Sequence, residues 1–483
     1  ELAVAASHAT VVHPAGSPVY VVVGHLFTLL PWGDAAYRLN LMSAVFATLT
    51  FLVTGAIIHH LAEPTPTTAR RTGAVLGALA VAFSPVFWSQ ALIAEVYTLH
   101  MFLFALFCLL LLIWRGLPER AWQRSALVCL MGLVLGLGLG NHVTFGVVIP
   151  SSLGFLVLMR WGGARFPLRH ALFLLPGLVG MGVGAYLLLP LWAQQTPWAS
   201  PWDPTDFSRL WDHVSGGPFK GLLLSAPAWS IPRMLAVGSM VLRQYGWLGF
   251  LVAIVGSWET ARTDKPVLAF GGLTAALTVL FAVMYPVYDS EVYLLPFYWL
   301  LGVAFGVGAT MAAVEIQQFV ATRLSFPGRP QSKVQLASAL TALLLFTVPA
   351  GSYLGNRGQL DVSQDTAAYS YARTTLAALP PHSLLLSGSP IETLALWYLQ
   401  HEVNWRTDVL VLDTFWLHLN TYQRNLARVH PDLAPPAGTA NYLQHIIENS
   451  RSTRPIYGTE SSLDKVTSSR VQLDGALYRV LPQ

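Results

Sequence analysis

The chain has 483 residues, of which 54% are hydrophobic and only 11% are charged, and its formal net charge is +4. Soluble domains carry roughly 25% charged residues, so the composition excludes an ordinary soluble protein. The positive charge forms no patch on a soluble domain, which excludes a nucleic-acid-binding protein.

Apolar stretches fill most of residues 35–353. A stretch of about 20 apolar residues crosses a bilayer as a helix. Ten membrane helices are therefore predicted, at 35–62, 72–90, 97–115, 122–140, 143–160, 170–192, 234–258, 266–284, 292–314 and 334–353.

Two further segments are expected to lie at the outer membrane interface. Residues 20–30 are apolar but too short to span, with Trp32 and Tyr37 as interfacial aromatics. The long loop 193–233 is rich in Trp and Pro, and 206–213 within it is expected to be a short helix. An ordinary connecting loop is the alternative for 193–233.

From Gly355 the composition becomes polar and mixed. The segments Ser383–Ser387 and Asp408–Asp413 are typical of short buried strands, and the helical stretch Ile391–Glu402 lies between them. Further strands are expected at Ile456–Thr459 and Ala476–Val480. The fold class is a polytopic α-helical membrane bundle, residues 1–353, followed by a small α/β domain, residues 354–483.

Basic residues are concentrated in one set of loops. They are Arg70, Arg71, Arg115, Arg120, Arg124, Arg160, Arg165, Arg169, Arg262, Lys265, Arg323, Arg329 and Lys333. The alternate short loops, near 91–96, 141–142 and 285–291, have none, and 193–233 has three. The positive-inside rule makes the first set cytoplasmic, so both chain ends are expected outside a bacterial inner membrane. An outer start without an export signal predicts one more membrane helix upstream of Glu1.

Acidic side chains at the outer ends of membrane helices are the main chemical signal, because ionisable groups near membrane depth are costly and usually functional. They are Glu1, Glu95, Asp289 and Glu291, and His8, His13, Asn141 and His142 belong to the same face. Helix capping is the alternative role of Glu95 and Asp289, and a polar turn that of Asn141–His142. Arg243 either snorkels to the surface or holds a lipid phosphate.

Carboxylates at the outer lip of a membrane bundle suit glycosyl transfer from a polyprenyl-phosphate sugar. A carboxylate can deprotonate the acceptor hydroxyl, and a cation or amide can stabilise the departing phosphate. No zinc-ligand spacing, phosphate-binding glycine loop or nucleophile elbow competes with this interpretation. No cofactor is predicted, and a divalent metal is left open. Cys108 and Cys129 lie in apolar spans, so no disulfide framework is expected.

Several motifs resemble a bacterial multispanning membrane family, formerly of unknown function, that is related to the eukaryotic O-mannosyltransferase acting on plexin-type receptor domains. The similar segments are His13-Pro-Ala-Gly-Ser-Pro-Val-Tyr20, Tyr37-Arg-Leu-Asn-Leu-Met-Ser43, Phe83 to Tyr97, Gly140-Asn-His142, Asp289 with Tyr293 and Pro296, Leu396-Trp-Tyr-Leu-Gln400 and Arg406-Thr-Asp-Val409. They extend over almost the whole chain.

The resemblance implies a class C glycosyltransferase that inverts the anomeric carbon and transfers a mannose-like sugar to protein Ser/Thr or a cell-envelope glycan. In the family an Asp-x-Gly-Glu motif precedes this region; Glu1 matches its end, and its Asp, the expected base, lies before Glu1. Departures from the family occur at Ala15 and in Gly388-Ser-Pro-Ile-Glu392. The catalytic residues are expected to be Glu1, Glu95 and Asp289. The substrate-binding residues are expected to be His13, Arg38, Asn141, His142, Arg243, Glu291 and Tyr293, with His142, Arg243 and Arg38 near the donor phosphate.

Two other classes of protein fit part of the sequence. A transporter or lipid flippase would place charges near the midplane, often in repeated halves, whereas this chain has its carboxylates at one rim and no repeat. A non-catalytic membrane scaffold would not need acidic groups that converge. The tail is expected to shape acceptor access and to supply no catalytic group.

Overall fold

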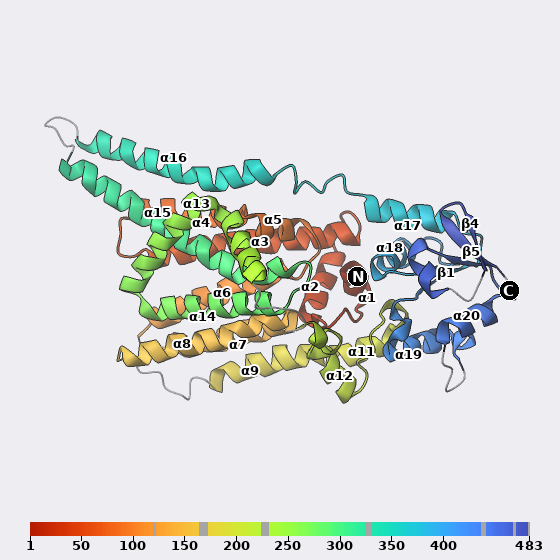
Figure 1. Cartoon of the computed structure of the whole chain (residues 1–483). Helices are drawn as coiled ribbons and strands as arrows, with labels where there is room; N and C mark the ends of the chain where they lie inside the picture. The colour runs from red at the N-terminus through yellow and green to blue at the C-terminus, as the bar shows by residue number, and fades with distance from the viewer. Residues whose placement is uncertain are drawn as a thin grey trace. The chain divides into compact units, whose positions relative to one another are not determined.

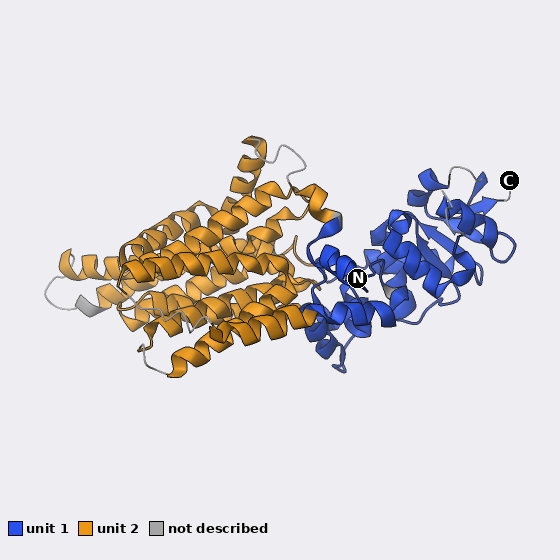
Figure 2. Cartoon of the chain, turned by 90° about the horizontal axis from the view of Figure 1, so that it is seen from below, with its two compact units in different colours: residues 1–39, 186–218, 362–483 blue, residues 40–185, 219–361 orange. Residues whose placement is uncertain are grey.

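The computed structural model describes residues 1–118, 122–163, 172–223, 231–323, 330–435, 441–466 and 470–481. The chain divides into two compact units, which Figure 2 shows in different colours. Unit 1 contains residues 1–39, 186–218 and 362–483, and unit 2 contains residues 40–185 and 219–361. This division differs from the predicted linear boundary between residues 353 and 354, because two earlier segments group with the tail.

Nine helical segments in the described part of the chain are long and apolar enough to cross a membrane, and one bent helix pair would make ten. Many of their side chains, such as Leu52, Leu153 and Leu251, are apolar and exposed. Large exposed apolar surfaces on such helices are those that lipid covers. The chain is therefore a multi-pass membrane protein, and the predicted number of spans equals the upper count.

The long helices are labelled in Figure 1. They are α3 (Ala35–Leu61), α6 (Tyr97–Gly116), α7 (Trp122–Asn141), α8 (Val148–Trp161), α13 (Ile231–Thr263), α14 (Lys265–Met284), α15 (Leu295–Arg323) and α16 (Pro330–Asn356). A further span, Leu172–Gln195, contains α9 (Leu175–Gly177), a π-helical turn (Leu178–Val183), α10 (Gly184–Tyr186) and α11 (Leu188–Gln195).

Two of the predicted straight spans are broken. The span expected at 72–90 is a pair of helices, α4 (Thr67–Ala82) and α5 (Pro85–Leu92), bent by 65°. Ser84 is extended, with φ −63° and ψ 133°, because a residue before proline is disfavoured in the helical region. Helix α13 is interrupted at Gly246, whose φ of +62° is readily adopted only by glycine.

Glycines bring the helices of unit 2 close together around α15, which packs against α4, α13 and α16. A Cβ at Gly256 of α13 would collide with the carbonyl of Ala304, and a Cβ at Gly308 of α15 would collide with the carbonyl of Val252. Small residues that allow backbones to touch are typical of membrane helix interfaces. This packing holds the helix ends of unit 2 in fixed positions.

Basic loops lie at the end of unit 2 opposite the short acidic ones. Arg115, at the end of α6 away from Tyr97, forms an ion pair with Asp264 between α13 and α14. Glu63, between α3 and α4, lines a small cavity together with Asp264. The predicted separation of charge is thus present in unit 2, and which end faces the cytoplasm stays a prediction. Arg120, Arg165, Arg169 and Arg329 lie outside the described residues.

Unit 1 contains both short helices expected from the sequence. The apolar segment near residues 20–30 forms α2 (Pro18–Thr28), and the segment near 206–213 forms α12 (Phe207–Val214). Asp206 caps α12 by accepting a hydrogen bond from the Arg209 amide at 2.9 Å. Besides α11, the other α-helices of unit 1 are α1 (Leu2–His8), α17 (Ala367–Ala377), α18 (Pro390–His401), α19 (Asn420–Val429) and α20 (Tyr442–Ser450).

The tail of unit 1 is an α/β domain with a five-stranded sheet in the order β2-β1-β3-β5-β4. The strands are β1 (Leu384–Ser387), β2 (Leu410–Asp413), β3 (Ile456–Gly458), β4 (Arg470–Asp474) and β5 (Leu477–Leu481). Strands β1 and β2 are parallel, with Leu384 opposite Leu410, and α18 connects them, so the predicted βαβ unit is confirmed. Strand β4 was not predicted.

Candidate functional site

The predicted site residues divide between the two units. Seven belong to unit 2, namely Glu95, Asn141, His142, Arg243, Asp289, Glu291 and Tyr293, and three belong to unit 1, namely Glu1, His13 and Arg38. That Glu1, Glu95 and Asp289 converge therefore stays a prediction, whereas the arrangement within each unit is defined.

Three helix junctions of unit 2 meet in a cluster of rings. Tyr97 begins α6, His142 follows α7, and Tyr293 lies in the 3-10 helix Ser290–Leu294 after α14. The ring centroids of Tyr97 and His142 are 5.8 Å apart, those of Tyr97 and Tyr293 are 6.3 Å apart, and those of His142 and Tyr293 are 6.1 Å apart. Loops distant in the sequence therefore form one local surface, which we call the tyrosine cluster: Tyr97, His142, Tyr285 and Tyr293.

Two predicted carboxylates face this tyrosine cluster. Glu95 and Asp289 both lie within electrostatic range of the hydroxyl groups of Tyr97 and Tyr293, which are hydrogen-bonded to each other. Burial, and then the Asp289 carboxylate, raises the pKa of Tyr285. The cluster therefore combines a neutral phenol, which can donate a hydrogen bond, with carboxylates that can accept a proton.

Helix capping does not account for either carboxylate. Asp289 occupies the N-cap position of the Ser290–Leu294 helix without a side-chain cap hydrogen bond. Helix α6 has no side-chain cap hydrogen bond, and the contact of the Glu95 carboxylate with the neighbouring Val96 amide is long, at 3.4 Å. The capping alternative is therefore not supported for either side chain, and a role in catalysis stays a prediction.

Asn141 and His142 differ in their roles. His142 caps the turn that follows it, with Nδ1 2.7 Å from Thr144 Oγ1 and 3.4 Å from the Thr144 amide, so the polar-turn alternative holds for its side chain. Asn141 is completely buried and donates from Nδ2 to the Val96 carbonyl at 3.1 Å. Its Oδ1 has no hydrogen-bond partner among the described residues. This oxygen can accept a hydrogen bond from a ligand.

Arg243 is the positively charged residue among the predicted site residues of unit 2, and it lies three residues before the helix break at Gly246. Its guanidinium lies 3.8 Å from the Glu291 carboxylate, and both side chains are exposed, by 64% and 40%. Such a pair is weak, since exposed ion pairs contribute about 0–1 kcal/mol. Arg243 can therefore leave Glu291 for an anionic ligand at little cost.

Sequence reasoning missed three residues of this site, Tyr97, Tyr285 and His100. His100 is buried on α6, and its ring centroid lies 6.0 Å from that of His142 and 5.4 Å from that of Phe145. Its Nδ1 has no hydrogen-bond partner within the described part of the chain. The spacing of Tyr97 and His100, three residues apart on one helix face, was the signal that could have identified them.

In unit 1, Glu1 binds His13 in two ways. One carboxylate oxygen accepts from the His13 amide at 2.6 Å, and the other lies 2.7 Å from His13 Nδ1. Burial by itself raises the pKa of Glu1, but the charge and hydrogen bonds of His13 outweigh burial and lower this pKa to about 2. The structure thus brings two predicted site residues, Glu1 and His13, into direct contact. Their role in catalysis stays a prediction.

Arg38 is engaged by the backbone. Its guanidinium donates hydrogen bonds to the backbone carbonyls of Thr28, Trp32 and Gly33, at the end of α2 and in the connection that follows it. Because three carbonyls occupy it, these contacts favour a structural role over the predicted binding of the donor phosphate.

No group of three or more His, Cys, Asp or Glu side chains in the described ranges is arranged to hold a metal ion. No residue is therefore assigned to a metal.

Comparisons with known proteins show similarity to an O-mannosyl-transferase sequence and a fold shared with solved structures. A family model for the N-terminal domain of protein O-mannosyl-transferase TMEM260 matches residues 1–162. The mouse protein O-mannosyl-transferase TMEM260 is 24% identical over 480 residues, which cover 95% of this chain and 65% of the mouse protein. The chain thus spans just under two thirds of the length of this relative.

Solved structures match along almost the whole chain. ArnT from Cupriavidus metallidurans in the apo state has a TM-score of 0.61 at 12% identity, with 98% of this chain and 90% of that chain covered. The same protein bound to undecaprenyl phosphate gives 0.57 at 12% identity, covering 98% and 89%. The apo oligosaccharyltransferase of Archaeoglobus fulgidus gives 0.51 at 10% identity, covering 95% and 64%. The chain therefore has the class C glycosyltransferase fold and is related to the eukaryotic O-mannosyltransferase.

Proposed function

We propose that this relative of the eukaryotic O-mannosyltransferases is a membrane glycosyltransferase that moves a sugar from a polyprenyl-phosphate donor to a hydroxyl acceptor. The observation that carries the proposal is the arrangement of Glu95 and Asp289 around the Tyr97–Tyr293 pair at the end of unit 2 that lacks basic loops. A transporter would not need two carboxylates at the same end of its membrane helices. A non-catalytic scaffold would not need two carboxylates close to the same tyrosines.

In the proposed reaction the acceptor oxygen attacks the anomeric carbon of the donor sugar. The new bond to carbon forms as the bond from carbon to the phosphate oxygen breaks, and the anomeric configuration inverts. The acceptor proton passes to a carboxylate, and the departing phosphate keeps the electron pair of the broken bond. The resemblance implies that the base is the Asp that precedes Glu1; within this chain, Glu95 and Asp289 are the carboxylates proposed to assist it or to take the proton. Arg243, whose exposed pairing with Glu291 is weak, is proposed as the cation that stabilises that phosphate.

The donor and acceptor classes are inferred from the relatives. A solved structure with this fold is bound to undecaprenyl phosphate, which supports a polyprenyl-phosphate donor here. The mouse relative is named a protein O-mannosyl-transferase, which supports a mannose-like sugar and a protein Ser/Thr acceptor, with a cell-envelope glycan as the other acceptor. The reaction would occur on the extracytoplasmic face.

The decisive assay uses the full chain in lipid nanodiscs with a panel of polyprenyl-phosphate sugars and a Ser/Thr-rich acceptor peptide. We expect transfer from the mannose donor and an inverted linkage, which NMR of the product identifies. Absence of transfer from every donor, or retention of configuration, would contradict the proposal.

The proposed orientation has its own test. Reporter fusions at Thr65, between α3 and α4, and at Gly358, after α16, should report opposite compartments, because the loop around Thr65 precedes two arginines. The same compartment at both positions would overturn the topology.

Convergence of Glu1 on the unit 2 carboxylates is tested by a double-mutant cycle. Groups that share a site show non-additive effects, whereas distant groups are additive within about 0.5 kcal/mol. We expect Glu1→Gln and Asp289→Asn to be non-additive in kcat. Additive effects would place Glu1 outside the site.

A further inference from the structure

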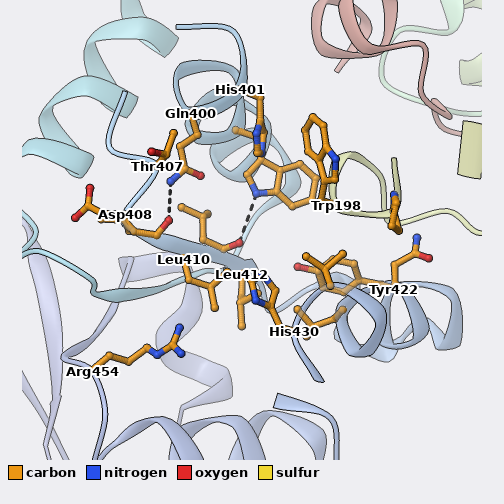
Figure 3. A pocket seen from close by; sticks show the side chains of 17 residues that line it. Trp198, Gln400, His401, Thr407, Asp408, Leu410, Leu412, Tyr422, His430 and Arg454 are labelled. Carbon is orange, nitrogen blue, oxygen red and sulfur yellow. Dashed lines mark hydrogen bonds between the residues drawn. The ribbon is translucent and has the colours of Figure 1, made fainter. Parts of the chain in front are cut away.

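Unit 1 contains a cavity, lined mainly by residues of the tail domain, that the proposed transfer reaction does not use. It has a volume of about 390 Å³ and lies beside the edge strand β2, between α18 and α19 (Figure 3). All of its lining residues belong to unit 1. Sites for small ligands typically have volumes of about 300–1,000 Å³, so the cavity is large enough for one small molecule.

The usual ligand position of an open α/β sheet is already filled. Ligands generally bind at the carboxyl ends of parallel strands where the strand order reverses, which here is the end of β1 and β3. Glu392 occupies that position and accepts hydrogen bonds from Thr459 at 3.0 Å and Ser461 at 2.6 Å. A Cβ at Gly388 would collide with the Ser461 backbone. A ligand of this domain therefore has to bind elsewhere.

An added peptide strand does not fit the cavity either. Side chains cover the outer edge of β2: Gln400 Nε2 donates to the Val409 carbonyl at 2.7 Å, and Trp397 Nε1 donates to the Val411 carbonyl at 3.4 Å. The Asp413 amide donates to the Tyr422 hydroxyl at 3.1 Å. An edge strand capped in this way has few backbone groups left for pairing.

The cavity offers aromatic faces. Trp198, from the short 3-10 helix Pro197–Ala199, is half-buried and lies with its ring centroid 4.2 Å from that of His401 on α18. Trp397 and Tyr422 also line the cavity, and Figure 3 shows Trp198, His401 and Tyr422 around it. Flat apolar surfaces of this kind suit a ligand with one apolar face.

The lining carries no net charge near neutral pH. The carboxylate of Asp408 forms an ion pair with the guanidinium of Arg406 at 2.8 Å. The guanidinium of Arg454 forms an ion pair with the carboxylate of Asp432 at 3.2 Å. Burial, with the nearby His8, lowers the pKa of His401 to about 4, and burial also lowers the pKa of His430. Both rings are therefore neutral at pH 7. These groups favour a neutral ligand over a phosphate.

One buried acceptor in the cavity wall has no partner. Asn425 donates from Nδ2 to the carbonyls of Ser200 and Trp202, each at 3.0 Å, and is 2% exposed. Its Oδ1 makes no hydrogen bond to any described residue. An unpaired buried acceptor is costly, by about 1–3 kcal/mol, and a ligand hydroxyl would satisfy it.

We propose that this cavity is a binding site for one neutral sugar ring. A pyranose has an apolar face of C–H groups, which fits Trp198, and a rim of hydroxyl groups, which can donate to Asn425 Oδ1. The site does not rest on the proposed transfer reaction, although a sugar-bearing acceptor would be a natural source of its ligand. The sugar can come free in solution or attached to a polypeptide, and the two sources are separated below.

Binding is measured on the full chain in lipid nanodiscs, without maltoside or glucoside detergents, because these carry sugars. The probes are methyl α-mannoside, a mannosylated threonine peptide, the same peptide unmodified, and inorganic phosphate. Saturation-transfer NMR and calorimetry should detect the mannoside and the glycopeptide, and neither the bare peptide nor phosphate. A much tighter glycopeptide identifies the attached sugar as the source, and equal affinities identify the free sugar. Binding of the bare peptide or of phosphate in preference to the mannoside would overturn the proposal.

Matched tryptophan variants locate the binding. Trp198→Ala should weaken mannoside binding about tenfold, since it removes the stacking face. Trp211→Ala is the control, because Trp211 is exposed on α12 of the same unit and does not line the cavity. Trp198→Phe keeps an aromatic face and should retain most of the affinity. Equal binding by Trp198→Ala and the parent chain would overturn the site.

A cavity-filling variant provides a second test of the binding site, in case Trp198→Ala does not fold. Leu410 lines the cavity and is only partly buried, so Leu410→Phe adds volume to the cavity itself. Circular dichroism and gel-filtration elution check its fold. The filled variant should lose mannoside binding, and unchanged binding would place the sugar elsewhere.

Discussion

Two aspartates in connections between membrane helices, Asp203 of unit 1 and Asp289 of unit 2, have opposite surroundings. Asp203 is fully buried and has three arginines near it, Arg209 at 3.1 Å, Arg424 at 3.0 Å and Arg428 at 3.9 Å. Asp289 is exposed and has no ion pair within the described residues; it faces tyrosines. A carboxylate whose oxygens are all bound by cations holds a structure, whereas one that faces hydroxyl groups can take a proton.

The same contrast extends to the rest of each unit. In unit 1, Glu1 is bound by His13, and Asp408 is bound by Arg406, which lowers the pKa of Asp408 well below its usual range. In unit 2, neither Glu95 nor Asp289 caps a helix. We therefore expect Asp203 and Asp408 of unit 1 to affect stability and the carboxylates of the unit 2 cluster to affect turnover; Glu1 is the exception, because the double-mutant cycle tests it for a role in turnover.

The largest effect is expected from the unit 2 carboxylates. Asp289→Asn and Glu95→Gln should each lower kcat by about 10²–10⁴-fold, the usual contribution of a general base. These changes remove charge and keep shape, so the thermal unfolding midpoint should stay the same. Near-normal turnover in both variants would remove these residues from the reaction.

Asp203→Asn should act on stability instead. The change leaves three arginines around a neutral amide, and loss of a buried ion partner costs about 3–5 kcal/mol, here near the lower end because the arginines are partly exposed. Chemical denaturation measures this change. The control is Asp206→Asn, which removes an exposed partner of the same Arg209 and keeps a good helix cap. Equal stability of the two variants would contradict the structural role of Asp203.

A third prediction concerns pH. Burial, with His13 nearby, lowers the pKa of His213 to about 4 from its usual 6.5. The unfolded chain therefore binds a proton between pH 6.5 and 4 that the folded chain does not, so stability is complete above this window and falls as the pH falls through it. The loss between pH 7 and pH 5 should be about 2 kcal/mol.

His213→Gln tests this prediction, because it removes the titrating group. The unfolding midpoint of this variant should change less between pH 7 and pH 5 than that of the parent chain. His418→Gln, at an exposed position of the same unit, is the control and should keep the parent slope. An unchanged slope in His213→Gln would assign the acid sensitivity to another group.

The smallest effect is expected at Arg243. Its exposed pairing with Glu291 contributes little to the fold, so Arg243→Gln should leave the unfolding midpoint unchanged. The variant loses one cation that binds the donor phosphate, so KM for the donor should rise about tenfold. A tenfold change corresponds to the loss of about one charge-assisted hydrogen bond. A normal KM would favour the snorkelling alternative.

Some elements were predictable because their signals are local. The turn at Ser84 could have been placed from Pro85 alone, since the residue before proline leaves the helical region. Strand β4 was missed although Arg470–Asp474 alternates polar and apolar residues, a signal that was available in the sequence; in the structure all five residues are exposed. Arg38 is predicted to lie near the donor phosphate; its hydrogen bonds to nearby backbone carbonyls depend on the local fold and have no signal in the sequence.

By itself the sequence determined the apolar spans, the one-sided distribution of basic loops and the βαβ unit of the tail. Hydropathy, charge and strand alternation are properties of consecutive residues, so they can be read along the chain. Only the tertiary structure decided that Glu95 and Asp289 face the same tyrosines, that Arg424 and Arg428 lie at Asp203, and that Asn425, which lines a cavity, has a buried oxygen without a partner among the described residues. Contacts between residues far apart in the sequence depend on how segments pack, which within unit 2 includes close glycine contacts such as that of Gly256 with Ala304.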